Sequence, residues 1–425
     1  MLDRELIRRQ PDFVRAGIER KGLDASIVDA FLAADESWRA ARTKQDAALA
    51  DSNRVSKGIG ALMAQGKKEE AEAAKAEASR LKAAIPEIEA EARTLEAALR
   101  QIELEMPNLP NENVPDGKGE NDNVVRRVVG NLPTFDGFTP KPHWEIADQH
   151  GLFDLPRGAK IAGSGFPVYM GLGARLQRAL VSFYADSITF ERGFQEVYPP
   201  IVVNRESLVG TGQLPKFEED LYRTTDDLFL VPTAEVPITN LYRDEILDAS
   251  ALPIRLAGYS ACFRREAGAA GKDTRGIQRV HQFDKVEMVK FTTPETSYEE
   301  LETMTADAES ILQALGLHYR VIEICTGDIG PKGTRQYDLE VWAPGVEKWL
   351  EVSSCSNFEA YQSRRANVRY RPEAGAKPEF VHILNGSALA VPRVYAAILE
   401  QFQQADGSVL LPEVLHRYMR VEKLG

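Results

Sequence analysis

The chain has 425 residues, of which 43% are hydrophobic and 27% charged, and its formal net charge is −12 at pH 7. This length exceeds one ordinary domain, and the composition is that of a soluble globular protein of two or three domains. No apolar run approaches the ~20 residues that a membrane-spanning helix needs. No secretory signal opens the sequence, so we expect a cytoplasmic protein with no membrane partner.

The first hundred residues carry apolar and small side chains at alternating steps of three and four, over residues 31–62 and again over 81–102. Such spacing predicts a coiled-coil seam, and the short break at residues 66–68 predicts two antiparallel helices. A helix of about 38 residues would be ~55 Å long, with Pro86 bending the second one locally. This coiled-coil arm is compatible with dimerisation or a spacer role as well as with RNA binding.

Residues 107–123 are rich in proline, asparagine and glycine and predict a linker. We therefore expect an N-terminal helical domain over residues 1–106 and a second domain over residues 124–425. In the second domain we expect helices over residues 172–188 and 298–315 and a C-terminal helix. Strands are predicted at residues 193–200, 319–324, 338–341, 349–352 and 379–384.

Most of these strands follow one another through hairpins, which favours an α+β fold with an antiparallel β-sheet flanked by helices. No GxxxxGK[ST] or GxGxxG phosphate loop occurs in the sequence. The three cysteines, Cys262, Cys325 and Cys355, are too scattered for a CxxC metal pair or a disulfide framework. The sequence therefore indicates neither a P-loop nor a dinucleotide-binding fold, and we expect each cysteine to be a small buried hydrophobic residue.

Residues 263–287, FRREAGAAGKDTRGIQRVHQFDKVE, predict two strands joined by a long glycine-bearing loop. Arg264 and Glu266 would close the first strand. One face of the second strand would carry alternate residues, namely Arg279, His281, Phe283, Lys285 and Glu287. Guanidinium groups, an aromatic ring and carboxylates on one surface suit a nucleoside triphosphate better than a core. A spare hairpin with a solvated face is the alternative interpretation.

The acidic net charge does not exclude a nucleic-acid partner, because binding depends on local basic patches. One patch lies in the hairpin loop and the other between residues 364 and 371. Their members are Arg264, Arg265, Lys272, Arg275 and Arg279 in the first, and Arg364, Arg365, Arg369 and Arg371 in the second.

With these segments in this order, the chain resembles the class II aminoacyl-tRNA synthetases, and among them the bacterial-type seryl-tRNA synthetases. Their first motif, a long helix and a strand ending in proline, matches the helix before GFQEVYPP and Pro200. Their second motif matches FRRE at residues 263–266 together with Phe283. Their third matches NGSALAVPR at residues 385–393. The arm, the TAE triplet at residues 233–235 and the run EVSSCSN at residues 351–357 mark the seryl type.

The resemblance implies an adenylation site in which catalysis is positioning and charge stabilisation. Arg264 would hold the α-phosphate of ATP and the serine carboxylate. Arg279 and Arg393 would bind the outer phosphates of a bent ATP, and Phe283 would stack on adenine. The implied catalytic residues are Arg264 and Arg393. The implied ATP site comprises Arg264, Arg265, Glu266, Arg279, Val280, Phe283, Glu351, Val352, Ser353, Ser354 and Arg393.

The implied L-serine pocket comprises Thr233, Ala234, Glu235, Glu287 and Ser387. Glu287 would face the ammonium group, while Thr233, Glu235 and Ser387 read the hydroxymethyl group and reject alanine, which would leave them unpaired. Mg²⁺ would accompany ATP near Glu351 and Ser354, because both offer oxygen. No zinc is expected, since the arm and these motifs differ from the zinc-dependent archaeal type. His281 would share the active face, and we assign it no catalytic role.

The resemblance further implies a homodimer that uses ATP, L-serine and tRNA(Ser), with tRNA(Sec) as a possible second RNA substrate. Two alternatives stay open at this point. One is a class II synthetase for another small amino acid, although those for threonine, proline and histidine append a C-terminal anticodon-binding domain. The other is a serine ligase acting on a carrier protein, which resembles a synthetase without the arm.

Overall fold

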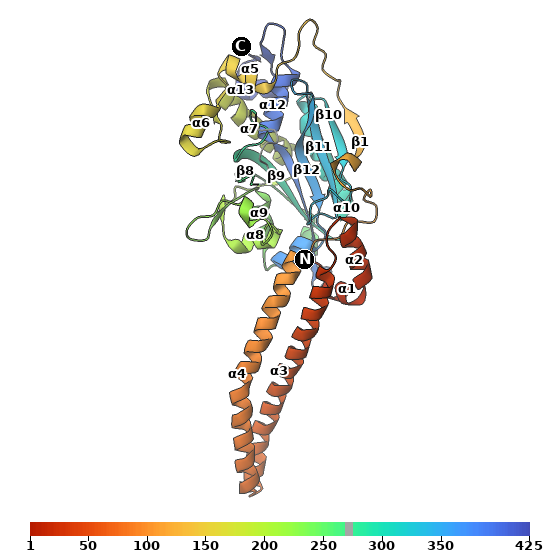
Figure 1. Ribbon diagram of the computed structural model, residues 1–425, viewed down its shortest axis with the longest axis vertical. Coiled ribbons are helices and arrows are strands. Elements are labelled where there is room, and N and C mark those ends of the chain that lie inside the picture. The colour runs from red at the N-terminus through yellow and green to blue at the C-terminus, as the bar shows by residue number, and fades with distance from the viewer. Residues whose placement is uncertain (268–274) are drawn as a thin grey trace. The chain divides into compact units, whose positions relative to one another are not determined.

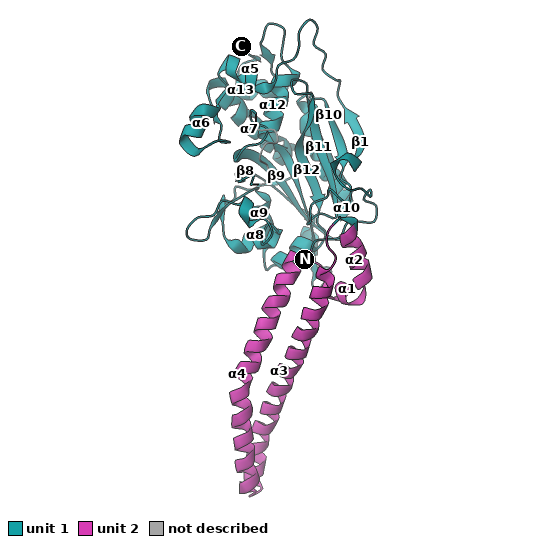
Figure 2. Ribbon diagram, viewed as in Figure 1, with its two compact units in different colours: residues 1, 20–22, 107–425 teal, residues 2–19, 23–106 magenta. Residues whose placement is uncertain are grey.

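The computed structural model describes residues 1–267 and 275–425, which form two compact units (Figure 2). The smaller unit comprises residues 2–19 and 23–106, and the larger one comprises residues 1, 20–22 and 107–425. Lys272, a member of the predicted basic patch, lies outside the described residues. Within the described part of the chain, every helix is too short or too polar to span a bilayer.

The smaller unit is entirely helical. Helices α1 (Arg4–Arg9) and α2 (Pro11–Arg20) precede the long helices α3 (Ile27–Ala64) and α4 (Lys68–Glu105), each of 38 residues. Helices α3 and α4 lie side by side and antiparallel, as their short connection requires (Figure 1). An ion pair of 2.8 Å joins Lys44 Nζ of α3 to Glu91 Oε2 of α4. The predicted coiled-coil arm is therefore confirmed, and Pro86 lies inside α4 as expected.

The larger unit is built on an eight-stranded sheet with the order β1-β10-β11-β12-β15-β9-β8-β4 (Figure 1). Every pair is antiparallel except β4 with β8, which is parallel. The strands are β1 (Val124–Val129), β4 (Gln195–Glu196), β8 (Ile254–Phe263), β9 (Gln282–Thr292), β10 (Tyr319–Glu323), β11 (Arg335–Ala343), β12 (Lys348–Asn357) and β15 (His382–Ala390). The predicted antiparallel α+β sheet is confirmed.

Two predicted strands have different bounds from those expected. The strand predicted over residues 193–200 shrinks to the two residues of β4, because Pro199 and Pro200 have no N–H group for a ladder. The strand predicted over residues 379–384 divides into β14 (Glu379–Phe380) and the start of β15.

One face of the sheet is covered by α7 (Gly171–Glu191), α10 (Ser297–Ala314) and α12 (Val391–Gln401), which confirms the three predicted helices. Met288 of β9 and Leu384 of β15 point into this core. Gly386 permits its close packing, because a Cβ there would lie 2.8 Å from Cys355 Sγ and 2.9 Å from Met304 Sδ. The alternate residues of β9 and β15 therefore point to the other face.

The linker predicted over residues 107–123 runs along the larger unit. The backbone N–H of Asn108 donates to the carbonyl of Pro331 over 2.8 Å, and that of Asn111 to the carbonyl of Thr334 over 2.9 Å. The segment therefore holds the chain at Pro331 and Thr334, within and beside residues 330–333, which line the site described below.

The hairpin prediction was partly wrong. Strand β8 ends at Phe263 and β9 begins at Gln282, so Arg264 and Glu266 follow the first strand, and Arg279 and His281 precede the second. Alternation therefore fails for His281: its ring stacks on Phe166 with centroids 5.3 Å apart, and its Nδ1 donates to the Arg264 carbonyl over 2.9 Å. The expectation that His281 lies on the active face is wrong, because these two contacts hold its ring against Phe166 and the Arg264 backbone, and it is not among the residues that line the cavity described below.

The buried imidazole of His382, the first residue of β15, should make the stability of the fold depend on pH. Burial lowers its pKa to about 4, against a raising effect of Glu295. The unfolded chain takes up the proton first as pH falls from about 6.5 to about 4, so stability is lost in that window, by at most about 3 kcal/mol. We expect urea unfolding at pH 7.5 and pH 4.5 to show this loss, and His382→Asn to reduce it. An unchanged loss in the variant would contradict this expectation.

Candidate active site

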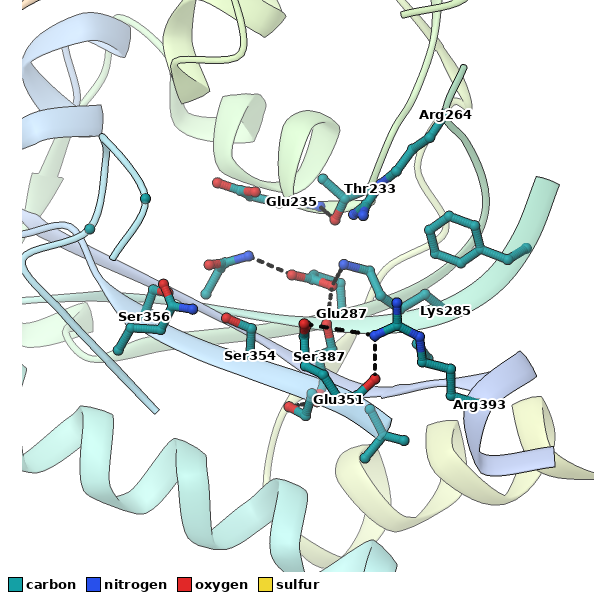
Figure 3. Close-up of a pocket in the computed structure, with 18 of the residues that line it drawn as sticks. Thr233, Glu235, Arg264, Lys285, Glu287, Glu351, Ser354, Ser356, Ser387 and Arg393 are labelled. Atoms are coloured by element: carbon teal, nitrogen blue, oxygen red, sulfur yellow. Dashed lines mark hydrogen bonds and ion pairs between the residues drawn. The ribbon is translucent and has the colours of Figure 1, made fainter. Parts of the chain in front are cut away.

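A cavity of about 460 Å³ lies on the face of the sheet that α7, α10 and α12 leave uncovered. Its lining comes from β9, β12, β15, the start of α9 (Glu235–Thr239) and residues 330–333 (Figure 3). The sequence-predicted site residues that line it are Thr233, Glu235, Arg264, Glu266, Arg279, Val280, Phe283, Glu287, Glu351, Val352, Ser353, Ser354, Ser387 and Arg393.

Two residues of the predicted site do not line this cavity. Ala234 is fully buried immediately before α9. The guanidinium carbon of Arg265 lies 6.0 Å from the ring centroid of Tyr222, and its backbone N–H donates to the Asp220 carbonyl over 2.9 Å. Arg265 therefore points away from its neighbours Arg264 and Glu266, which both line the cavity.

The carboxylate of Glu287 forms the floor of the cavity and is fully buried. Asn385 Nδ2 donates to its Oε1 over 2.5 Å, and Ser387 Oγ donates to its Oε2 over 3.3 Å. Lys285 Nζ lies 2.5 Å from the same Oε2. These donors come from two paired strands, since Glu287 of β9 stands opposite Ser387 of β15. Their contacts fix both oxygens of the carboxylate.

A second buried carboxylate, that of Glu235, forms the wall at the same end. Gln362 Nε2 donates to its Oε1 over 2.6 Å and Lys332 Nζ over 3.3 Å, while Gln213 Nε2 reaches Oε2 over 3.5 Å. The hydroxyl of Thr233 accepts the backbone N–H of Glu235 over 3.2 Å. This end of the cavity therefore combines two oriented carboxylates, which accept hydrogen bonds, with hydroxyl groups, an arrangement suited to a small ammonium-bearing alcohol.

The other end of the cavity carries arginine and an aromatic ring. The guanidinium carbon of Arg264 lies 5.1 Å from the ring centroid of Phe283. Arg279 Nη1 pairs with Glu266 Oε2 over 2.5 Å. Arg393, in the first turn of α12, donates from Nη1 to the Glu351 carbonyl over 2.7 Å. In Figure 3, Arg264 reaches in from above and Arg393 from below.

A buried pair holds the segment that leads into β9. His143, the first residue of α5 (His143–His150), and Glu400 of α12 are both fully buried, and His143 Nδ1 donates to Glu400 Oε1 over 2.7 Å. His143 Nε2 accepts the backbone N–H of Ile277 over 3.2 Å. Gly276, at φ 70°, permits this approach, since a Cβ would lie 2.1 Å from Nε2.

Helix α12 therefore anchors this segment twice. Glu400 near its end holds His143, and Arg393 at its start donates from Nε to the Gln278 carbonyl over 3.1 Å. Because Arg279 follows Gln278 directly, the two anchors fix the backbone from which Arg279 enters the cavity.

Glu351 and Ser354 place two oxygen donors together on β12. Beside them, burial and then the charge of Glu351 raise the pKa of the Asp338 carboxyl well above its usual range. An all-oxygen donor set next to crowded carboxyl groups fits a hard divalent cation such as Mg²⁺.

Several residues that line or support the cavity had no role in the predicted site. Lys285 was placed on the active face by strand alternation and Asn385 belongs to the third motif, so both carried a signal in the sequence. Lys332, Gln213 and Gln362 carried none, because they come from loops and a short helix far apart in the chain and meet only at Glu235.

Two protein-family models match this chain, one over the domain that holds the cavity and one over the helical N-terminal part. Residues 216–402 match the family model of the tRNA synthetase class II core domain (G, H, P, S and T), and residues 1–110 match that of the seryl-tRNA synthetase N-terminal domain. A serine–tRNA ligase of Roseiflexus sp. is 53% identical over 99% of this chain and 98% of its own.

Solved structures of similar proteins also cover the whole chain. The seryl-tRNA synthetase of Pyrococcus horikoshii complexed with ATP is 37% identical, with a TM-score of 0.92 over 100% of this chain and 99% of that one. The cytoplasmic serine–tRNA ligase of Naegleria fowleri in complex with AMP is 30% identical, with a TM-score of 0.87 over 100% and 98% of the two chains.

Proposed function

The chain belongs to the seryl-tRNA synthetase family of class II aminoacyl-tRNA synthetases, and we propose that its cavity joins L-serine to ATP. The enzyme is a serine–tRNA ligase, and this activity excludes the two alternatives that the sequence left open. One observation carries the assignment of the cavity. Two oriented carboxylates, Glu235 and Glu287, stand at one end, and Arg264, Arg279 and Arg393 line the remainder.

In the first half-reaction, an oxygen of the serine carboxylate attacks the α-phosphorus of ATP. The bond from that phosphorus to the bridging oxygen breaks, and pyrophosphate leaves with the electron pair. Both reactants are anions, so cationic side chains that neutralise them lower the barrier. Arg264 holds the α-phosphate and the serine carboxylate in this proposal, and its contact with Phe283 fixes its guanidinium beside the adenine position.

ATP lies bent over the sheet, with adenine on Phe283 and the outer phosphates on Arg279 and Arg393. Glu266 holds Arg279 in place through its 2.5 Å pair. Arg393 stands in the first turn of α12, where backbone N–H groups also favour anions. Val280, Val352 and Ser353 form the surrounding wall.

Mg²⁺, held by Glu351 and Ser354, would supply positive charge to the phosphates when bound. Its support is the all-oxygen donor set on β12, beside Asp338. The protein's own contribution there is to orient these two side chains, and Arg393 assists by holding the Glu351 carbonyl over 2.7 Å.

The serine ammonium group binds Glu287, and its hydroxymethyl group meets Thr233, Glu235 and Ser387. Lys332 and Gln362 both donate to Oε1 of Glu235, whereas Gln213 reaches Oε2 only over 3.5 Å. Oε2 is therefore the acceptor for the substrate hydroxyl, and a substrate without that hydroxyl leaves this buried oxygen with its long contact alone. Such a poorly paired group is the physical basis for rejecting alanine.

In the second half-reaction a ribose hydroxyl oxygen of the tRNA forms a bond to the carbonyl carbon of seryl-adenylate. The bond from that carbon to the phosphate oxygen breaks, AMP leaves with its electron pair, and the hydroxyl proton passes to solvent. We propose tRNA(Ser) as the RNA substrate and α3–α4 as the element that binds it. A cytoplasmic location follows from this proposal, because ribosomes consume aminoacyl-tRNA there.

Arg264→Ala should lower serine-dependent pyrophosphate–ATP exchange by about 10²–10³-fold, because it removes one preorganised donor from the transition state. The matched control is Arg223→Ala, whose guanidinium pairs with Asp227 over 2.7 Å outside the cavity and should leave exchange unchanged. Full exchange in the Arg264 variant would place the reaction elsewhere.

Replacing residues 45–90 by a short Gly-Ser loop should separate the two half-reactions. The Lys44–Glu91 pair of 2.8 Å shows that the cut ends lie close together, and Phe31 and Leu99 remain buried in the base of α3 and α4. We expect the rate of pyrophosphate–ATP exchange to stay within about twofold of that of the full chain. The kcat/KM for tRNA charging should fall at least about 100-fold, because the contacts between the arm and the phosphates and sugars of the tRNA are lost. Equal loss of both activities would make the arm a structural element.

We also propose a homodimer formed through the end of α7 and the edge strand β4. Phe190 and Tyr198 flank β4 and are 81% and 85% exposed, and Ile201 and Val202 add apolar surface beside them. Exposed aromatic side chains next to an edge strand suit a second copy of the same segment.

Light scattering should give a mass twice that of the 47.2 kDa chain, and the double variant Phe190→Glu, Tyr198→Glu should have half that mass. A wild-type mass of 47.2 kDa would refute the interface.

A further inference from the structure

Lys285 is a buried lysine in the cavity to which the proposed function gives no role. Its side chain is 7% exposed, and its Nζ lies 2.5 Å from Glu287 Oε2. It lines the cavity together with Arg264, Ser387 and Glu287 (Figure 3). A buried ammonium is expensive unless it is paired, so this lysine requires a partner in every state of the site.

The position of Lys285 along β9 is informative. Phe283, Lys285 and Glu287 are alternate residues of one strand, so they share a face at intervals of ~6.7 Å. All three line the cavity. If adenine lies on Phe283 and the serine ammonium on Glu287, the intervening length of seryl-adenylate passes over Lys285. That length contains the α-phosphate and the serine carboxylate, which are the two reacting anions.

The charges of the site support the same placement. Lys285 and Glu287 form a neutral pair in the ligand-free cavity, and serine enters as a zwitterion. Its ammonium group is attracted to Glu287 and its carboxylate to Lys285, so binding exchanges one ion pair for two. Glu287 keeps its neutral donors Asn385 and Ser387 during this exchange. No charge is left buried and unpaired, which is the condition that a low-dielectric site imposes.

We propose that Lys285 is a further catalytic residue, whose ammonium group turns from Glu287 to the serine carboxylate and the α-phosphate as adenylation proceeds. This role rests on the proposed function of the cavity. Lys285 keeps its proton throughout: the carboxylate oxygen forms the bond to phosphorus, and pyrophosphate leaves with the electron pair of the broken bond. Lys285 complements Arg264, which approaches the same atoms from the opposite wall.

The test uses the full-length enzyme, serine and ATP, with pyrophosphate release measured in a single turnover. Lys285→Met removes the charge at nearly constant length, and Lys285→Arg retains it. The matched control is Lys290→Met, because Lys290 is a buried lysine of the same strand that pairs with Glu300 over 2.8 Å outside the cavity. If the methionine variant does not fold, as judged by its melting temperature, Lys285→Gln takes its place.

We expect Lys285→Met to slow adenylate formation at saturating serine and ATP by about 100-fold or more, with much smaller changes in either KM. Lys285→Arg should recover most of the rate, and Lys290→Met should retain it. A lysine that only neutralises Glu287 would alter the KM for serine and leave the saturated rate within about threefold.

That second result would overturn the proposal for Lys285, provided that Arg264→Ala slows adenylation by about 100-fold or more in the same assay. If Arg264→Ala is also fully active, the cavity itself is not the adenylation site, and the proposed function fails together with this inference. The two failures are therefore distinguishable.

Discussion

The burial of the Glu287 carboxylate is the constraint on which the rest of the site depends. A carboxylate removed from water costs several kcal/mol unless donors surround it. Here the donors are Asn385 and Ser387 from β15 and Lys285 from β9 itself. The burial of Glu287 therefore opposes a one-residue slip between β9 and β15, because that slip would turn Asn385 and Ser387 toward the helices.

Because side chains alternate along each strand, one face of the sheet packs against helices and the other face carries the residues of the cavity. Residues such as Met288 and Leu384 bury one face under α7, α10 and α12, and their neighbours on the other face remain available for charge. Helix α12 connects the two faces, since it packs on the sheet and also carries Arg393 and Glu400 to the segment before β9. Rigid support of this kind is what catalysis by positioning requires, because the cations must stand in place before the anions arrive.

Much of this arrangement could be predicted from the sequence, because local patterns determine it. Heptad-like spacing predicted α3 and α4, local residue patterns predicted β12 and the pairing of β8 with β9 though not the ends of those two strands, and the third motif marked the junction of β15 with α12. Strand alternation failed at His281, whose ring packs on Phe166, and Arg279 lines the cavity from the segment before β9, which begins only at Gln282. Contacts between distant segments had no local signal: Gln213, Lys332 and Gln362 meet at Glu235, and His143 meets Ile277 and Glu400.

A structure of the enzyme with a non-hydrolysable seryl-adenylate analogue tests the central claim most directly. The account predicts the analogue's ammonium group within hydrogen-bonding distance of Glu287, its adenine against Phe283, and its phosphate mimic between Arg264 and Lys285. An analogue bound outside this cavity, or with its adenine at Glu287, would contradict the account.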